Sequence, residues 1–135
     1  MSVSGWVSSG GADIGTNRYV PSGDAIAQTW RFGDGSPAAH GGTPVAGLPG
    51  YQLFDSLAVD GEGHVCAATL ITGAVSDIWP DGSRVDQYML PDMMVTNVCF
   101  GGRELRTAFA TLSMGGTLVS FEWPRPGLPL NYLNT

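Results

Sequence analysis

The chain has 135 residues, of which 43% are hydrophobic and only 13% charged, so it is long enough for one domain with a sizeable core. Its 20 glycines and 9 prolines interrupt nearly every stretch of ten residues, which excludes a coiled coil and favours an all-β protein. A net charge of −6 argues against nucleic acid or an anionic membrane as a partner, because both attract basic patches.

The N-terminus lacks the basic and apolar regions of a signal peptide, and no apolar run approaches the ~20 residues of a membrane helix. We therefore expect a cytoplasmic protein that does not bind membranes. Cys66 and Cys99 lie in apolar, strand-like runs without a CxxC pair or a metal-ligand cluster. We expect two buried free thiols, and the sequence leaves a disulfide between them open.

Short runs of alternating residues, ended by turn signals, dominate the middle of the chain. Asp60 and Asp81 each precede a glycine in such turns and are expected to be structural, because Asp-Gly favours tight hairpins. A long surface connection, with one outer strand near Val45, is expected at residues 33–49. The predicted strands cover residues 26–32, 57–59, 65–70, 74–79 and 85–90.

Part of this pattern repeats along the chain. Ala68-Thr69-Leu70 recurs as Ala110-Thr111-Leu112, and Trp79-Pro80 recurs as Trp123-Pro124. A period of about 40–45 residues with four strands per unit is typical of a β-propeller blade. At that period the chain holds about three four-stranded blades, so residues 21–135 are predicted to form a partial β-propeller. Residues 1–20 are left as an unassigned N-terminal segment.

Three stretches carry a family resemblance. Residues 55–65 begin Asp55-Ser56-Leu57-Ala58-Val59-Asp60, residues 90–102 include Thr96-Asn97 and Phe100-Gly101-Gly102, and residues 116–129 end in Gly127-Leu128-Pro129. In order and spacing they resemble the C-terminal half of the senescence-marker-protein/gluconolactonase (regucalcin-like) family. The resemblance implies a six-bladed β-propeller that hydrolyses lactones with one divalent cation (Ca²⁺, Zn²⁺, Mn²⁺ or Mg²⁺) in its central channel.

The same resemblance implies a role for Asp55. The family holds its cation with a Glu near the chain start, an Asn in an Asn-Gly motif and the Asp of a Pro-Asp-Gly motif. Asp55 matches the last of these, although Ser56 replaces the glycine, and the first two ligands have no match. Asp55 is therefore the expected metal ligand and catalytic base, with a turn aspartate that caps its own backbone as the structural alternative.

Asn97 and Thr96 are the expected substrate-binding residues, because they begin the strand that is equivalent by repeat to the one at Asp55. The alternative for Asn97 is a strand-end amide that satisfies backbone groups. His40 and His64 belong to no recognisable nucleophile motif. The three tryptophans at repeat positions are expected to be packing residues: Trp30, Trp79 and Trp123.

Two hypotheses for function follow from these residues. In the first, the chain is a metal-dependent hydrolase for a small-molecule lactone, and the missing ligands come from a second copy, in a homodimer of half-propellers, or from another chain. In the second, the chain is a truncated, non-catalytic propeller fragment that acts as a binding or structural module. Stoichiometry and metal dependence distinguish the two.

Overall fold

A computed structural model describes the backbone of residues 6–7, 12–16, 25–31 and 43–130, and the side chains of residues 45–130. Within these ranges no helix is long and apolar enough to cross a membrane. The strands are β1 (Trp6–Val7), β2 (Ala12–Thr16), β3 (Ala25–Arg31), β4 (Thr43–Leu48), β5 (Leu53–Val59), β6 (Val65–Leu70), β7 (Ala74–Ile78), β8 (Val85–Met89), β9 (Val95–Gly101), β10 (Thr107–Leu112) and β11 (Thr117–Glu122).

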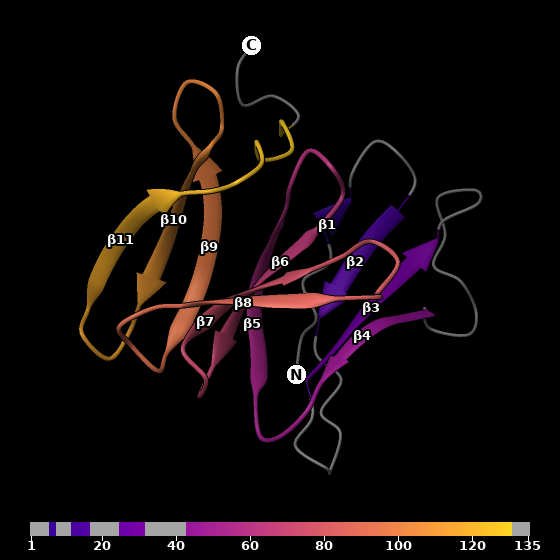
Figure 1. Cartoon of the computed structure of the whole chain (residues 1–135), viewed down its shortest axis with the longest axis horizontal. Coiled ribbons are helices and arrows are strands. Elements are labelled where there is room, and N and C mark those ends of the chain that lie inside the picture. Colours follow the sequence, from indigo (N-terminus) through magenta and orange to yellow (C-terminus); the bar gives the residue numbers. More distant parts are fainter. Residues whose placement is uncertain (1–5, 8–11, 17–24, 32–42, 131–135) are drawn as a thin grey trace.

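The strands form three antiparallel sheets in which neighbours in the chain are also neighbours in the sheet (Figure 1). The first sheet has the order β1-β2-β3-β4, the second β5-β6-β7-β8, and the third β9-β10-β11. Strand β5 contacts β2 and β3 of the first sheet, and β9 contacts β5, β6 and β7 of the second. The second sheet therefore lies between the other two, and the predicted all-β fold is confirmed.

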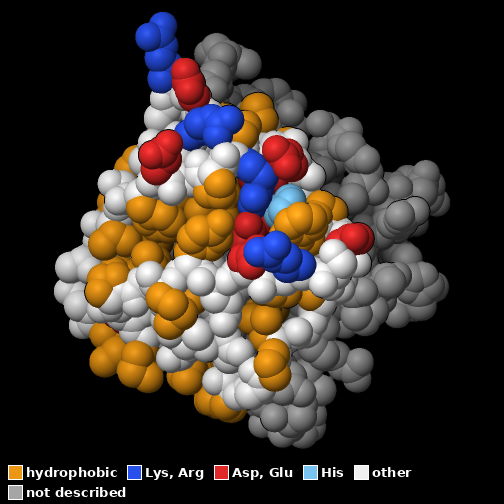
Figure 2. All heavy atoms as spheres, viewed as in Figure 1, with side chains coloured by type: hydrophobic (Ala, Val, Ile, Leu, Met, Phe, Trp, Pro, Cys, Tyr) orange, Lys and Arg blue, Asp and Glu red, His pale blue; other side chains and the backbone are white. Residues whose placement is uncertain are grey.

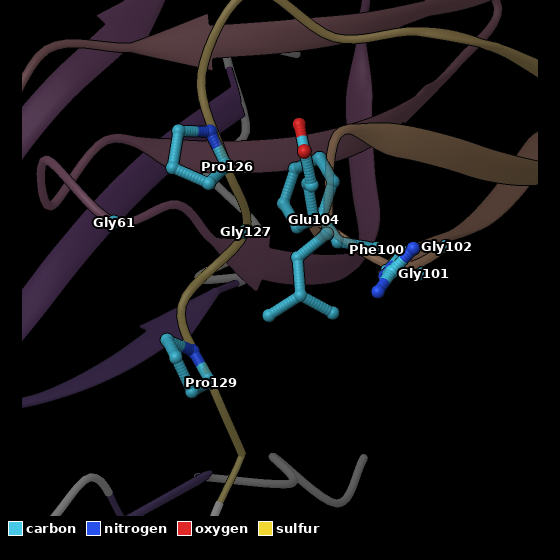
Figure 3. Close-up of a pocket in the computed structure, with 10 residues that line it drawn as sticks. Gly61, Phe100, Gly101, Gly102, Glu104, Pro126, Gly127 and Pro129 are labelled. Carbon is cyan, nitrogen blue, oxygen red and sulfur yellow. The ribbon is translucent and has the colours of Figure 1, made fainter.

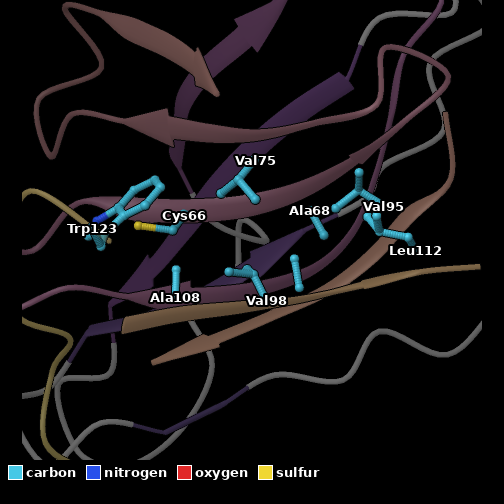
Figure 4. Close-up of a cluster of buried hydrophobic side chains, with 9 residues drawn as sticks. Cys66, Ala68, Val75, Val95, Val98, Ala108, Leu112 and Trp123 are labelled. Carbon is cyan, nitrogen blue, oxygen red and sulfur yellow. The ribbon is translucent and has the colours of Figure 1, made fainter. Parts of the chain in front are cut away.

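The second sheet forms the centre of the core because both of its faces are covered. Successive side chains of a strand point to opposite faces, and β6 and β7 are buried along almost their whole length. Val65 and Ala67 of β6 belong to a cluster that faces the first sheet and includes Leu48. Cys66 and Ala68 belong to a cluster that faces the third sheet and includes Val98, Ala108 and Trp123 (Figure 4).

A close approach of the first sheet to the second explains one glycine. Gly82 has φ +71°, and a Cβ at this position would lie 1.8 Å from the carbonyl oxygen of Val45 in β4. Only glycine fits such a turn against another backbone. The strand expected near Val45 is therefore present, and it packs on the turn between β7 and β8.

The tail after β11 returns from the third sheet to the second. The Gly61 N–H donates to the carbonyl of Pro126 at 2.7 Å, and the Leu128 N–H donates to that of Val59 at 3.0 Å. The Gly127 N–H donates to the carbonyl of Leu105 at 2.8 Å, so the tail bridges the turns of two sheets.

Several sequence predictions can be judged at the level of single side chains. Cys66 is a buried free thiol as expected, but Cys99 is a free thiol on an exposed face of β9, so its predicted burial is wrong. Trp123 is fully buried among the rings of Tyr88, Phe100 and Phe121, which confirms its packing role. Trp79 is 36% exposed and lies against His64. The side chains of Trp30 and His40 lie outside the described residues.

Candidate functional site

Asp55 lies on a β-bulge in the strand that begins the second sheet. Phe54 pairs with Thr69 and Leu57 with Ala67, so Asp55 and Ser56 together oppose a single residue of β6. Bulges redirect side chains and are frequent next to active sites. The Asp55 side chain is exposed, and partial burial raises the pKa of its carboxyl above the ordinary value.

Thr96 occupies a second bulge, at the same end of the neighbouring sheet. Asn97 pairs with Thr111 and Val95 with Leu112, which leaves Thr96 without a partner in the register of β9 and β10. The hydroxyls of Thr96 and Thr111 are hydrogen-bonded at 2.9 Å. The first strands of the second and third sheets, β5 and β9, are thus irregular where the sequence predicts site residues.

A hydrogen bond connects the two bulged strands. The Ser56 hydroxyl donates to Oδ1 of Asn97 at 2.9 Å, although 41 residues separate the two in the chain. Because Oδ1 accepts from Ser56, the amide NH₂ of Asn97 is the group left to donate, and it has no partner among the described residues. The structure therefore brings Asn97 to the residue beside Asp55. An exposed carboxylate, a hydroxyl and an amide donor therefore lie at the starts of β5 and β9. We refer to these residues, Asp55, Ser56, Thr96 and Asn97, as the rim.

A second group of polar side chains is buried at the other end of β5. Asp60 directly follows the strand, His64 ends the turn, Asp77 lies on β7 and Arg125 lies on the tail. Nδ1 of His64 contacts Oδ1 of Asp77 at 2.8 Å, and Nη2 of Arg125 donates to Oδ2 of Asp77 at 2.5 Å. Nε of Arg125 donates to Oδ2 of Asp60. Figure 2 shows charged side chains gathered around this histidine, in pale blue.

Asp60 also performs the role predicted for it. Its Oδ1 accepts from the backbone N–H groups of Glu62 at 3.0 Å and His64 at 2.9 Å, which closes the turn before β6. The rest of the cluster was not predicted from the sequence. No local spacing marks Arg125 as a partner of Asp60, because 65 residues separate them. The one available signal is a basic residue between two prolines in a chain with six basic residues.

The buried cluster has electrostatic consequences for its neighbours. Burial lowers the pKa of Arg125, but hydrogen bonds and charge from Asp77 and Asp60 outweigh that effect and hold it above the ordinary value. Burial, followed by the charges of Asp60 and Asp77, raises the pKa of the Cys66 thiol. Cys66 is therefore a packing residue and not a thiolate nucleophile.

The cluster does not fit a metal ion, although its donor atoms are close enough to do so. Ligand atoms of Asp60, His64 and Asp77 lie within 4.8 Å of one another. However, every carboxylate oxygen already accepts a hydrogen bond, and the Arg125 guanidinium supplies the positive charge. We interpret the cluster as an internal ion pair that fastens the tail. Asp55, in contrast, has carboxylate oxygens without hydrogen-bond partners among the described residues, and a hard cation prefers oxygen ligands of this kind.

A cavity of about 650 Å³ lies away from the predicted site residues (Figure 3). It is at the far end of β9 from Asn97, between that strand and the tail, and neither Asp55 nor Thr96 lines it. Gly101 in its wall lies four positions along β9 from Asn97, a distance of about 13 Å. The wall is mainly glycine and proline backbone with the exposed side chain of Glu104.

Two curated relatives match part of the chain. Pentonolactonase XacC of Haloferax volcanii is 33% identical over 63 residues, which cover 47% of this chain and 22% of that protein. The 6-deoxy-6-sulfogluconolactonase of Pseudomonas putida is 35% identical over 75 residues, covering 54% of this chain and 26% of that protein. The chain thus matches about a quarter of the length of these relatives.

Solved structures extend the similarity to most of the chain. An X-ray structure of a protein described as a gluconolactonase is 26% identical to this chain and superimposes on it with a TM-score of 0.60. The match covers 86% of this chain and 41% of that one. The calcium-binding protein regucalcin of Agrobacterium tumefaciens shares the fold, with a TM-score of 0.61 at 19% identity over 84% of this chain and 42% of that one. The profile of the SMP-30/Gluconolactonase/LRE-like region matches residues 20–114. With most of its length matched by that profile, the chain belongs to the SMP-30/gluconolactonase/LRE-like family.

Proposed function

We propose that this chain contributes to the hydrolysis of a small-molecule lactone, with Asp55 as the carboxylate that binds a divalent cation and activates water. The observation that carries the proposal is the rim at the start of β5. There an exposed carboxylate with a raised pKa adjoins the Ser56–Asn97 hydrogen bond. The two lactonases among the relatives support the substrate class, because family membership gives the reaction a precedent.

Each residue of the rim has a distinct task in this proposal. A bound cation would polarise the lactone carbonyl and lower the pKa of water. Asp55 would supply one hard oxygen ligand, and its second carboxylate oxygen accepts a proton as water adds to the carbonyl carbon. The amide NH₂ of Asn97 donates to an oxygen of the substrate, while Thr96 is fixed by its bond to Thr111. The bond between the carbonyl carbon and the ring oxygen then breaks, and the ring oxygen takes the proton from Asp55, which gives a hydroxy acid.

The ligand set on this chain is incomplete, and this shapes the proposal further. A single carboxylate is too little for a cation such as Ca²⁺, which takes 6–8 oxygen ligands. We propose that a second copy of the chain supplies the other ligands. In this homodimer each chain is a half-propeller of three sheets, and an outer sheet face of one copy packs against an outer sheet face of the other. The outer face of the third sheet supports this arrangement, because Asn97, Cys99 and Leu118 are exposed on it. The boundary at residues 20/21 and the cytoplasmic location stay predictions.

Two measurements test the proposal together. Molar mass in solution, measured by light scattering with and without Ca²⁺, should correspond to an even number of chains. Cation-dependent lactone hydrolysis by the wild type should be lost in Asp55→Ala and kept in Asp81→Ala, whose exposed carboxylate serves a turn. Unchanged turnover in Asp55→Ala would remove Asp55 from the mechanism.

The second candidate function is a non-catalytic propeller module. It is favoured by the missing family ligands, since no Glu precedes Glu62 and no Asn-Gly occurs in the sequence. A single-chain molar mass together with no cation-dependent hydrolysis would establish this alternative.

A further inference from the structure

The outer edge of the third sheet is formed by β11, which lies at the rim of the molecule (Figure 1). Strand β11 pairs with β10 over its whole length, from Thr107 with Glu122 to Leu112 with Thr117, without a register shift. On its other side no strand of the described part of the chain pairs with it. Its backbone N–H and C=O groups on that side are therefore available to another strand.

The other outer edges carry features that discourage such pairing. Strand β1 has only two residues. Strand β4 contains Pro44 and an irregular register beside Val45, and the Gly82 turn packs on it. Strand β8 carries Asp86, which forms an exposed ion pair with Arg84 at 2.8 Å. Short length, proline, irregularity and charge are the usual means by which proteins protect edge strands.

Strand β11 has none of these features. Its sequence, Thr-Leu-Val-Ser-Phe-Glu, contains no proline, glycine or basic residue, and its one charge lies at the last position. Most of its side chains are exposed, and Leu118 is 66% exposed. Figure 2 shows apolar side chains gathered on the side of the molecule where the third sheet lies. Among the strands that the structure describes, this outer edge is regular, extended and unguarded.

We propose that β11 pairs antiparallel with β11 of a second copy, about a two-fold axis at Ser120. This register places Val119 opposite Phe121 twice, and aromatic with β-branched pairs stabilise sheets. Each Glu122 lies opposite Leu118, so the two carboxylates are about 13 Å apart along the strands. That distance exceeds the Debye length of about 8 Å at physiological salt, and no like charges oppose one another.

The same geometry predicts that edge pairing closes at two copies. Among the strands that the structure describes, each chain has one unguarded outer edge, and an antiparallel two-fold contact uses the same patch on both copies, so pairing through this edge ends at two. This inference goes beyond the proposed function. The half-propeller arrangement stacks sheet faces, whereas the β11 contact joins sheet edges and leaves those faces free.

Cross-linking tests the register. In an antiparallel pair, opposite Cα atoms lie about 4.5–5.5 Å apart, which a disulfide spans. Under mild oxidation, Ser120→Cys should form a covalent dimer on a denaturing gel. The wild type, which retains Cys66 and the exposed Cys99, serves as the background control. Met89→Cys places a cysteine at an exposed position of β8 and should not cross-link above that background. Absence of a Ser120-specific cross-link overturns the proposed register.

Charge at the edge tests the contact itself. Ser120→Lys should reduce the molar mass in solution by half while the far-ultraviolet circular dichroism stays that of the wild type, and Met89→Lys should leave the mass unchanged. A wild-type mass equal to one chain, or an unchanged mass in folded Ser120→Lys, overturns the inference. The Ser120→Cys cross-link should still form when Asp55→Ala, which abolishes the proposed hydrolysis, is present in the same chain, so loss of the edge contact and failure of the proposed function are distinguishable.

Discussion

Two aspartates at opposite ends of β5 have opposite surroundings. Asp60 is fully buried, and both its oxygens are used, by two backbone N–H groups and by Arg125. Asp55 is exposed on a bulge, no hydrogen bond to its carboxylate occurs within the described residues, and its pKa is raised by partial burial. A saturated carboxylate has no capacity left for a ligand. We conclude that the buried end of β5 stabilises the fold, whereas the exposed end keeps the carboxylate oxygens that the proposed function requires.

The largest expected effect is on the buried end. Arg125→Ala leaves two carboxylates of Asp60 and Asp77 buried without their cation, and breaking such a pair costs about 3–5 kcal/mol. We expect the free energy of unfolding, measured with urea, to fall by that amount. Arg84→Ala removes an exposed ion pair and should cost less than about 1 kcal/mol. Equal losses of unfolding free energy in the two variants would contradict the role of Arg125 as the residue whose buried ion pairs hold the tail on the second sheet.

Part of the difference between the two ends of β5 could be predicted from the sequence. The Asp-Gly turn at Asp60 and the strands around it depend on neighbouring residues, so alternation and turn chemistry were sufficient. Asp55 was found through the family resemblance, although its bulge has no local sequence signal. Arg125 was missed because its contacts arise when the tail crosses to another sheet, and no pattern in one sequence encodes that crossing.

Cys99 shows a different limit of sequence patterns. Alternation places Cys99 on one face of β9 and Val98 on the other, and the structure agrees. Whether a face is covered depends on the next sheet, and the described residues place a sheet on the Val98 side alone. The pattern predicted the strand correctly, but burial of both faces was an assumption.

A smaller effect is expected at the partner of Ser56. Asn97→Ala removes the amide donor proposed for substrate, and one hydrogen bond is worth about 1 kcal/mol or more. We expect kcat/KM for a lactone to fall about tenfold, since about 1.4 kcal/mol corresponds to that factor. Unfolding free energy should change little, because the side chain is exposed. Thr117→Ala, which truncates an exposed polar side chain on β11 of the same sheet, is the control. Hydrolysis that is unchanged in Asn97→Ala would return Asn97 to a structural role.

The smallest expected effect concerns the contribution of Asp55 to the free energy of unfolding and its dependence on pH. Because partial burial raises its pKa in the folded state, that state binds the proton more tightly than the unfolded state does. The wild type therefore loses stability as the pH rises above the ordinary value of 3.8 and through the raised one. Asp55→Asn does not titrate. It should match the wild type at a pH below 3.8 and be slightly more stable at neutral pH, as judged from urea unfolding midpoints.

Asp81→Asn provides a control with the opposite sign. Hydrogen bonds from the side chain and backbone of Ser83 lower the pKa of Asp81, so its ionised form favours the folded state. That variant should be less stable than the wild type at neutral pH. A bound cation would also reverse the sign at Asp55, because it stabilises the ionised carboxylate. Asp55→Asn should thus be more stable than the wild type after treatment with a chelator and less stable with an added divalent cation. No change on adding the cation would contradict Asp55 as its ligand.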